Sequence, residues 1–156
     1  MASPAAIGAG VGGGAIALAG TSYAAYTQLR PYDDFLDYAN RNWLVYIGDT
    51  ANGFKNKISA DTGDGTQNGY RKILSEKLNL ISGTDNQINA DDIQKAGKDA
   101  DDSDKAKLNK VARKVRDWCE SNKTKGSKST DNVNWASIKE NADWQNFERL
   151  CLETSK

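Results

Sequence analysis

The sequence of 156 residues contains no histidine, and it has only two cysteines, two prolines and one methionine. Histidine is a frequent general base and the commonest metal ligand, so its absence excludes the usual histidine-dependent catalysis and the usual zinc sites. A cysteine nucleophile activated by histidine is excluded for the same reason. The sequence therefore predicts a protein that is not an enzyme, with no catalytic residues, no metal site and no cofactor.

Charged residues are missing from the start of the chain, because no Asp, Glu, Lys or Arg precedes Arg30. The uncharged run 5–26 is rich in alanine and glycine, and as a helix it is long enough to cross the roughly 30 Å hydrocarbon core of a bilayer. Gly8 and Gly12 are small residues at four-residue spacing, which allows two membrane helices to approach closely. We therefore predict a transmembrane or signal-anchor segment over residues 1–29, in contact with the membrane through residues 5–26, and a candidate homo-oligomer contact at Gly8 and Gly12.

Three other interpretations compete for the same residues. Small residues at 17–19 and 22–24 suit cleavage by a signal peptidase, although no positive charge precedes the apolar run. The run Gly8-x-Gly10-x-x-Gly13 matches a dinucleotide-binding fingerprint, but too few residues precede it to form the strand that this fingerprint requires. A flexible alanine and glycine tail is the third alternative.

The remaining residues, 30–156, have the size of one ordinary domain. The 21 basic and 21 acidic residues of the chain cancel overall but not locally. Residues 30–104 hold 9 basic and 14 acidic residues, whereas residues 105–156 hold 12 basic and 7 acidic residues. The domain is therefore acidic in its first part and basic in its second part.

Basic residues are densest over 105–128, where nine Lys and Arg stand against only Asp117 and Glu120. Such a helix can hold phosphate groups, and Trp118 can stack on a base, so a nucleic-acid-binding module is an alternative function. The basic residues are also what is left once the apolar positions of this helix are removed. A solvated helix face is the preferred interpretation, and no nucleic-acid partner is predicted.

Apolar residues recur at three- and four-residue spacing in several segments, which predicts an all-α fold. The domain is expected to be a small bundle of four to five helices that follows the N-terminal membrane or signal helix. The predicted helices cover residues 32–47, 70–81, 89–98, 103–122 and a final segment from about Asn141, and residues 50–68 are predicted to form a loop.

Two helix boundaries carry more specific signals. Trp43–Ile47 is apolar without interruption, so this end of the first helix can instead be a strand. Asn89 is a suitable N-cap, with acidic residues in the turn after it and with Ile88 and Ile93 at the positions of a hydrophobic staple.

Cys119 and Cys151 both fall on apolar helical faces, and two interpretations remain open. They are either two buried thiols or a disulfide that joins the last two helices, and a disulfide suits an exported domain. The same faces carry Trp118, Trp144 and Phe147, which we predict to form one structural core cluster with the cysteines rather than a binding site.

The layout of the whole chain resembles a known group of proteins. It has an uncharged Ala/Gly-rich leader, a Lys/Asn-rich helical body, a basic segment that ends in Trp118-Cys119, and a Trp, a Phe and Cys151 near its C-terminus. In these features it is similar to uncharacterised paralogous protein families of haemotropic mycoplasmas. The resemblance implies a membrane-anchored or exported protein, and it brings no catalytic residues with it.

The sequence as a whole favours a membrane-anchored or exported, non-enzymatic surface or interaction protein with a protein partner of unknown identity and no small-molecule substrate. Its expected location is the cell membrane as a single-pass protein, with secretion after signal cleavage as the alternative. Arg30 and Arg41 follow the span and favour a cytoplasmic body by the positive-inside rule. The cysteines and the resemblance favour the other side, and we predict an extracytoplasmic body.

Overall fold

The computed structural model describes residues 30–61, 69–83, 88–97 and 101–154. The chain divides into two compact units, Met1–Pro31 and Tyr32–Lys156, and the structure described below is that of the second. The predicted membrane segment, with Gly8, Gly10, Gly12 and Gly13, lies outside the described residues. No helix within the described ranges is both long and apolar enough to cross a membrane.

The described part of the chain is mainly helical, as the sequence predicts, with a small two-stranded sheet in addition. Its elements are α2 (Phe35–Arg41), β1 (Leu44–Tyr46), the 3-10 helix η2 (Ile47–Asp49), α3 (Gly53–Ser59), α4 (Gly69–Glu76), α5 (Leu78–Ser82), α6 (Ala90–Lys95), α7 (Asp102–Asn122), the 3-10 helices η4 (Ser129–Asp131) and η5 (Trp135–Glu140), α8 (Ala142–Cys151) and β2 (Leu152–Thr154).

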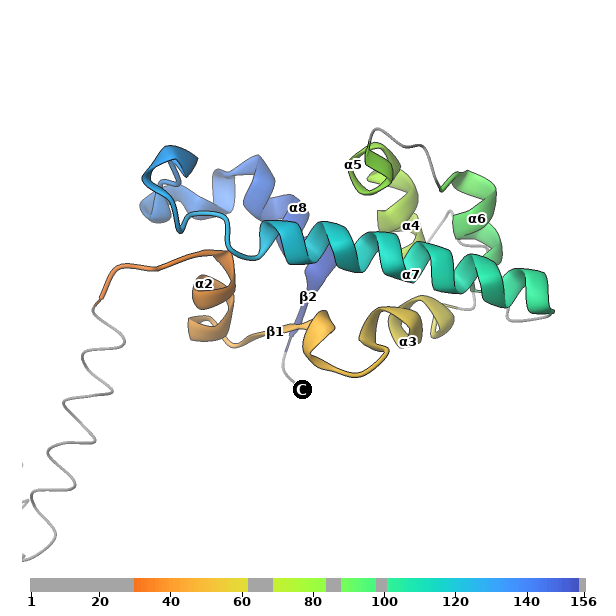
Figure 1. Cartoon of the computed structure of the whole chain (residues 1–156). Helices are drawn as coiled ribbons and strands as arrows, with labels where there is room; N and C mark the ends of the chain where they lie inside the picture. The colour runs from red at the N-terminus through yellow and green to blue at the C-terminus, as the bar shows by residue number, and fades with distance from the viewer. Residues whose placement is uncertain (1–29, 62–68, 84–87, 98–100, 155–156) are drawn as a thin grey trace, which may run out of the picture. The chain divides into compact units, whose positions relative to one another are not determined.

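Helix α7 is the element around which the others pack. It has 21 residues, and Asp101 caps its start by accepting a hydrogen bond from the backbone N–H of Asp104. Figure 1 shows α3 on one side of α7 and α4, α5 and α6 on the other, with α8 beside its C-terminal part. Its buried apolar residues recur at three- and four-residue spacing: Leu108, Val111, Ala112, Val115 and Cys119. The apolar stripe predicted from the sequence holds these residues and also Trp118, which is only partly buried in the structure.

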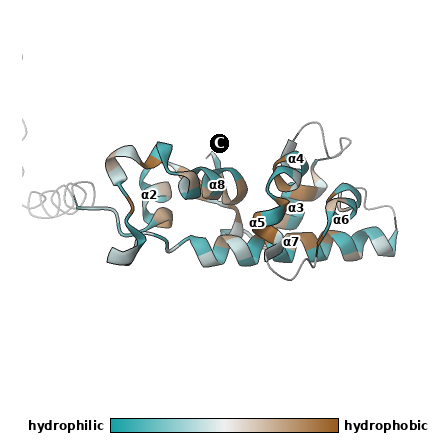
Figure 2. Cartoon of the chain, turned by 90° about the horizontal axis from the view of Figure 1, so that it is seen from above, coloured by the Kyte–Doolittle hydropathy of each residue, from teal (hydrophilic) through white to brown (hydrophobic). Residues whose placement is uncertain are grey.

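The core is richest in aromatic side chains where α2 meets α8. The Phe35 ring lies 5.4 Å from Trp144 and 5.6 Å from Phe147, measured between ring centroids, and Tyr38 lies 4.8 Å from Trp144. Aromatic pairs at these separations stabilise a core beyond the area that they bury. In Figure 2 the hydrophobic positions of the helices gather where the helices meet, while much of the visible side of α7 is hydrophilic.

Several helices begin or end at the capping residues that the sequence predicts. Asn89 caps α6 and forms a capping box with Asp92, with N···O distances of 2.9 and 3.0 Å. Asn141 caps α8, and Gly83 follows α5 with a positive φ of 61°. The long helix begins at Asp102, slightly earlier than predicted.

The predicted helix over 32–47 is wrong in its second half. Helix α2 ends at Arg41, and Trp43 then adopts a φ of 61°, a left-handed conformation that does not continue a helix. The alternative prediction of a strand is correct for Leu44–Tyr46, which pairs antiparallel with Leu152–Thr154. The predicted mainly helical class is confirmed, and the two-stranded sheet is an addition that the all-α prediction did not include.

Two further corrections concern the middle of the chain. The predicted loop over 50–68 contains α3, whose Phe54 and Ile58 are buried one helical turn apart. The predicted helix over 70–81 is two helices, α4 and α5, because Lys77 has the non-helical dihedrals φ −106° and ψ 15°. Because α3 was not predicted and one predicted helix is divided into α4 and α5, the described residues hold more helices than the four to five predicted.

Candidate functional site

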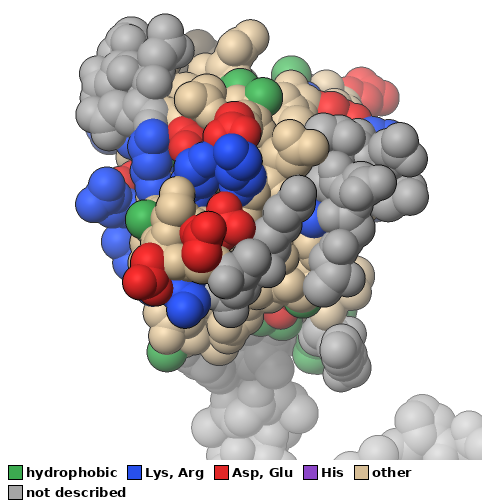
Figure 3. All heavy atoms as spheres, turned by 90° about the vertical axis from the view of Figure 1, so that its right-hand side faces the viewer, with side chains coloured by type: hydrophobic (Ala, Val, Ile, Leu, Met, Phe, Trp, Pro, Cys, Tyr) green, Lys and Arg blue, Asp and Glu red, His purple; other side chains and the backbone are tan. Residues whose placement is uncertain are grey.

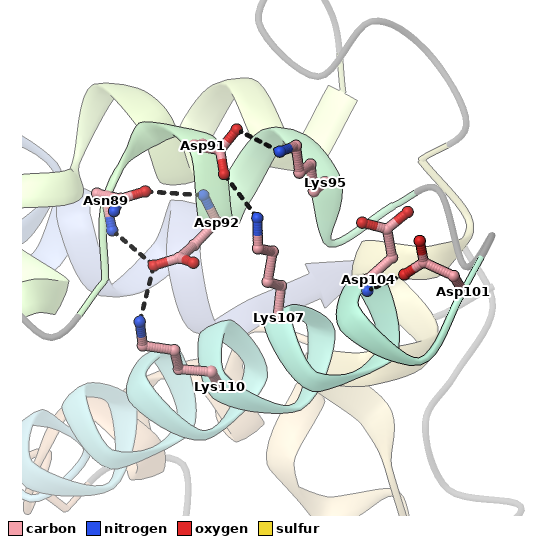
Figure 4. Close-up of polar contacts among 8 residues, drawn as sticks. All are labelled: Asn89, Asp91, Asp92, Lys95, Asp101, Asp104, Lys107 and Lys110. Atoms are coloured by element: carbon pink, nitrogen blue, oxygen red, sulfur yellow. Dashed lines mark hydrogen bonds and ion pairs between the residues drawn. The ribbon is translucent and has the colours of Figure 1, made fainter.

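Two lysines on α7, Lys107 and Lys110, contact carboxylates of the neighbouring helix α6. Asp91 of α6 accepts from Lys107 at 2.6 Å and from Lys95 at 3.0 Å, and Asp92 accepts from Lys110 at 2.9 Å (Figure 4). The hydrogen bond from Lys107, followed by that from Lys95, holds the pKa of the Asp91 carboxyl below its ordinary value. This network joins α6 to α7, so its charges serve packing between the two helices.

The same pattern continues along the predicted basic segment 105–128. Further ion pairs are Lys105 with Asp102, Arg116 with Asp117, Lys123 with Glu120, and Lys125 with Asp143. Figure 3 views the end of the molecule at the right of Figure 1 and shows basic and acidic side chains intermixed there. The basic helix therefore does not present a continuous positive track in the described structure, which weighs against the nucleic-acid alternative.

A cleft of about 700 Å³ separates the η2–α3 segment from α7. One wall is the chain from Gly48 to Lys55, and the other is α7 at Asn109, Ala112, Arg113 and Arg116. The side chains of Phe54 and Ala112 are only 4% and 5% exposed, so the inner surface of the cleft is partly apolar. We refer to this feature as the α3–α7 cleft.

The first wall of the cleft depends on two glycines. A Cβ on Gly53 would lie 2.0 Å from the backbone oxygen of Ile47, and a Cβ on Gly48 would lie 2.4 Å from the Tyr46 ring. Asn52, just before α3, has a φ of 60°. A larger residue at Gly53 would collide with backbone, so the turn that forms this wall requires glycine there.

The charges that line the α3–α7 cleft are mostly positive. Arg113 makes no ion pair or side-chain hydrogen bond with any described residue, and neither does the Lys55 ammonium group. Arg116 has a long contact, 3.9 Å from its Nε to an Asp117 carboxylate oxygen, and its charge also acts on the Glu120 carboxylate. Asp49 is the one acidic residue among the described lining residues. Guanidinium groups in such a setting are suited to bind oxyanions.

The structure joins Cys119 and Cys151 in a disulfide, with the two Cα atoms 5.7 Å apart. Both cysteines are fully buried, and they link α7 to α8. Of the two interpretations left open by the sequence, the structure therefore contains the disulfide. Trp144 and Phe147 are also buried, on the face of α8 that packs against the core.

Trp118 differs from the other members of the predicted cluster. It is only partly buried, packs at the edge of the core, and borders a shallow hollow with Leu80 and Ile81 of α5. Adjacent residues of an α-helix point about 100° apart, so a side chain next to the inward-facing Cys119 cannot share its direction. Trp118 therefore packs against the core, as predicted, but from its edge rather than from the inward face of α7.

A buried arginine that the sequence does not point to connects α4 with α6 and with the segment that follows α3. Arg71 of α4 is 1% exposed, donates to the carbonyl oxygen of Gln94 at 2.6 Å, and lies 3.9 Å from the Asp61 carboxylate. A Cβ on Gly97 would lie 2.5 Å from the Arg71 guanidinium, so the chain after α6 packs directly on it. Because it is enclosed, this pair is a structural contact rather than a ligand site.

The described ranges contain no group of three or more His, Cys, Asp or Glu side chains placed to hold a metal ion. Comparisons with known proteins find no matching protein family, no similar curated protein and no similar solved structure. The resemblance to the haemotropic mycoplasma families therefore stays a prediction. The α3–α7 cleft was missed because only the fold shows which cations of the basic segment lack a carboxylate partner.

Proposed function

We propose that the chain is a membrane-anchored or exported protein whose helical domain acts outside the cytoplasm as a non-enzymatic display and interaction module. The observation that carries this proposal is the buried disulfide between Cys119 and Cys151. Structural disulfides form and persist in oxidising compartments, whereas cytoplasmic thiols are kept reduced. A disulfide in the core of a small domain thus supports a location outside the cytoplasm.

Two features of the chain support an interaction role at the membrane. The uncharged segment 5–26 has the length of a membrane span, with secretion after cleavage as the alternative. Trp43 is 81% exposed at the start of β1, and large exposed aromatic residues are common anchors in protein interfaces. The proposed partners are the membrane, an unidentified protein, and a second copy of the chain through Gly8 and Gly12.

Protease treatment of intact cells tests the location. The full chain is expressed with a C-terminal epitope tag, and the tagged domain is followed by immunoblot before and after protease is added outside. We expect loss of the tagged domain while a cytoplasmic control protein stays intact. Full protection in intact cells, with digestion only after lysis, would reverse the assignment. If the tagged protein is instead found in the medium and is shortened at its N-terminus, the protein is secreted after signal cleavage.

A further inference from the structure

We propose that the α3–α7 cleft binds a phosphate or sulfate group carried by a small organic molecule. The inference goes beyond the location proposed above, because the purified protein can bind such an anion wherever the chain resides. It rests on the charges of the cleft, on their placement and on the size of the space between the walls.

Neither arginine on the α7 wall of the cleft has a close carboxylate partner among the described residues. Two lysines elsewhere on this helix contact carboxylates at short range, Lys107 with Asp91 at 2.6 Å and Lys110 with Asp92 at 2.9 Å. In the cleft, Arg113 has no ion-pair partner among the described residues, and Arg116 has a 3.9 Å contact with Asp117 and a longer-range electrostatic interaction with Glu120. An anion between the walls would meet cations that no described carboxylate holds at short range.

The positions of these cations suit a tetrahedral oxyanion. Arg113 and Arg116 are three residues apart on α7, so they stand on the same side of the helix about one turn apart. Lys55 lies on the opposite wall. Guanidinium groups donate two parallel hydrogen bonds to one oxyanion, and an ammonium group adds a point charge from the other side. Asp49 disfavours anions that approach its end of the cleft.

The size and the lining of the cleft suit a small molecule rather than a bare ion or a polymer. Its volume of about 700 Å³ falls within the usual range of small-ligand sites. Phe54 and Ala112 give an apolar contact for the organic part of the ligand, and the neutral polar side chains of Asn52 and Asn109 can orient it. A nucleic acid needs a continuous series of cations, which the ion pairs along α7 remove.

Chemical-shift perturbation of the full chain tests the proposal. The ¹⁵N-labelled protein is placed in phosphatidylcholine nanodiscs and titrated with glycerol 3-phosphate, inorganic phosphate and sulfate. We expect saturable shifts at the backbone amides of residues 48–55 and 109–116, with tighter binding of glycerol 3-phosphate than of inorganic phosphate. Nanodiscs that also contain phosphatidic acid distinguish the sources of the group. If the cleft amides already shift in the nanodiscs that contain phosphatidic acid, relative to those with phosphatidylcholine alone, the natural source of the phosphate is a lipid headgroup. If they do not shift, the source is a soluble ligand.

Variants separate binding in the cleft from general attraction of anions. Arg113→Gln combined with Arg116→Gln should raise the dissociation constant at least tenfold. Lys105→Gln, on the same helix but outside the cleft, should leave it within twofold. Arg113→Lys keeps the charge and should retain part of the affinity, and the amide spectrum of each variant shows whether it is folded. The proposal is overturned if no probe gives saturable cleft shifts, or if the double variant binds as tightly as the Lys105→Gln control.

Discussion

Reduction of the Cys119–Cys151 disulfide should remove a large part of the stability of the helical domain. The bond closes a loop with a sequence separation of 32 residues. On the chain-entropy account, a crosslink of this length stabilises the folded state by about 3 to 4 kcal/mol. A domain of ordinary size has a total stability of about 5 to 15 kcal/mol, so loss of the bond should be large by comparison.

Urea unfolding of the full chain, followed by tryptophan fluorescence with and without reductant, measures this contribution. With a urea dependence of about 1.5 kcal/mol per molar, the midpoint should fall by about 2 M when the bond is reduced. The variant that combines Cys119→Ala with Cys151→Ala is the control, since reductant has no bond to act on in it. A loss below about 1 kcal/mol on reduction would refute the reasoning, as would an equal response in the control.

Two further predictions concern the core and the pH dependence of stability. Trp144→Ala should lower the free energy of unfolding in urea by about 3 to 5 kcal/mol, because Trp144 is 1% exposed. Trp118→Ala should lower it by only about 1 to 2 kcal/mol, because Trp118 is partly buried. Equal losses of stability in the two variants would contradict this prediction. The hydrogen bond from Lys123, together with that from the Tyr46 hydroxyl, holds the pKa of Glu120 below its ordinary 4.5. The stabilisation that Glu120 provides is therefore complete above pH 4.5 and is lost as the pH falls through the lowered value. Glu120→Gln should destabilise the domain at pH 7, and its difference in stability from the parent protein should shrink as the pH is lowered below 4.5; a difference that stays constant over this titration would contradict the prediction.

The parts of the fold that sequence analysis predicts well are those that depend on neighbouring residues. Asn89 and the acidic turn after it start α6 because a capping box satisfies backbone N–H groups within four residues. The apolar stripe of α7 is long enough to define its inward face over several turns. Gly83 ends α5 because glycine adopts a positive φ without steric cost.

The parts that sequence analysis misses depend on contacts between distant segments. Strand β1 pairs Leu44 with Thr154, and three-residue strands have no periodicity that reveals such a partner. Helix α3 buries only two large apolar residues in a polar stretch, and packing against α7 is what holds it. The candidate site also depends on contacts between distant segments. In the sequence, Arg113 and Lys107 are both basic residues of one helix, and only the fold shows that Asp91 pairs with Lys107 and not with Arg113.

The redox state of Cys119 and Cys151 in intact cells is the most direct test of a displayed, disulfide-bonded domain. Cells are quenched in acid, the protein is denatured so that the buried sulfurs become accessible, and free thiols are labelled with a maleimide that adds a large mass. The account predicts no added mass without reductant and two additions after reduction. Two additions without any reductant would show a reduced pair and would contradict a location outside the cytoplasm.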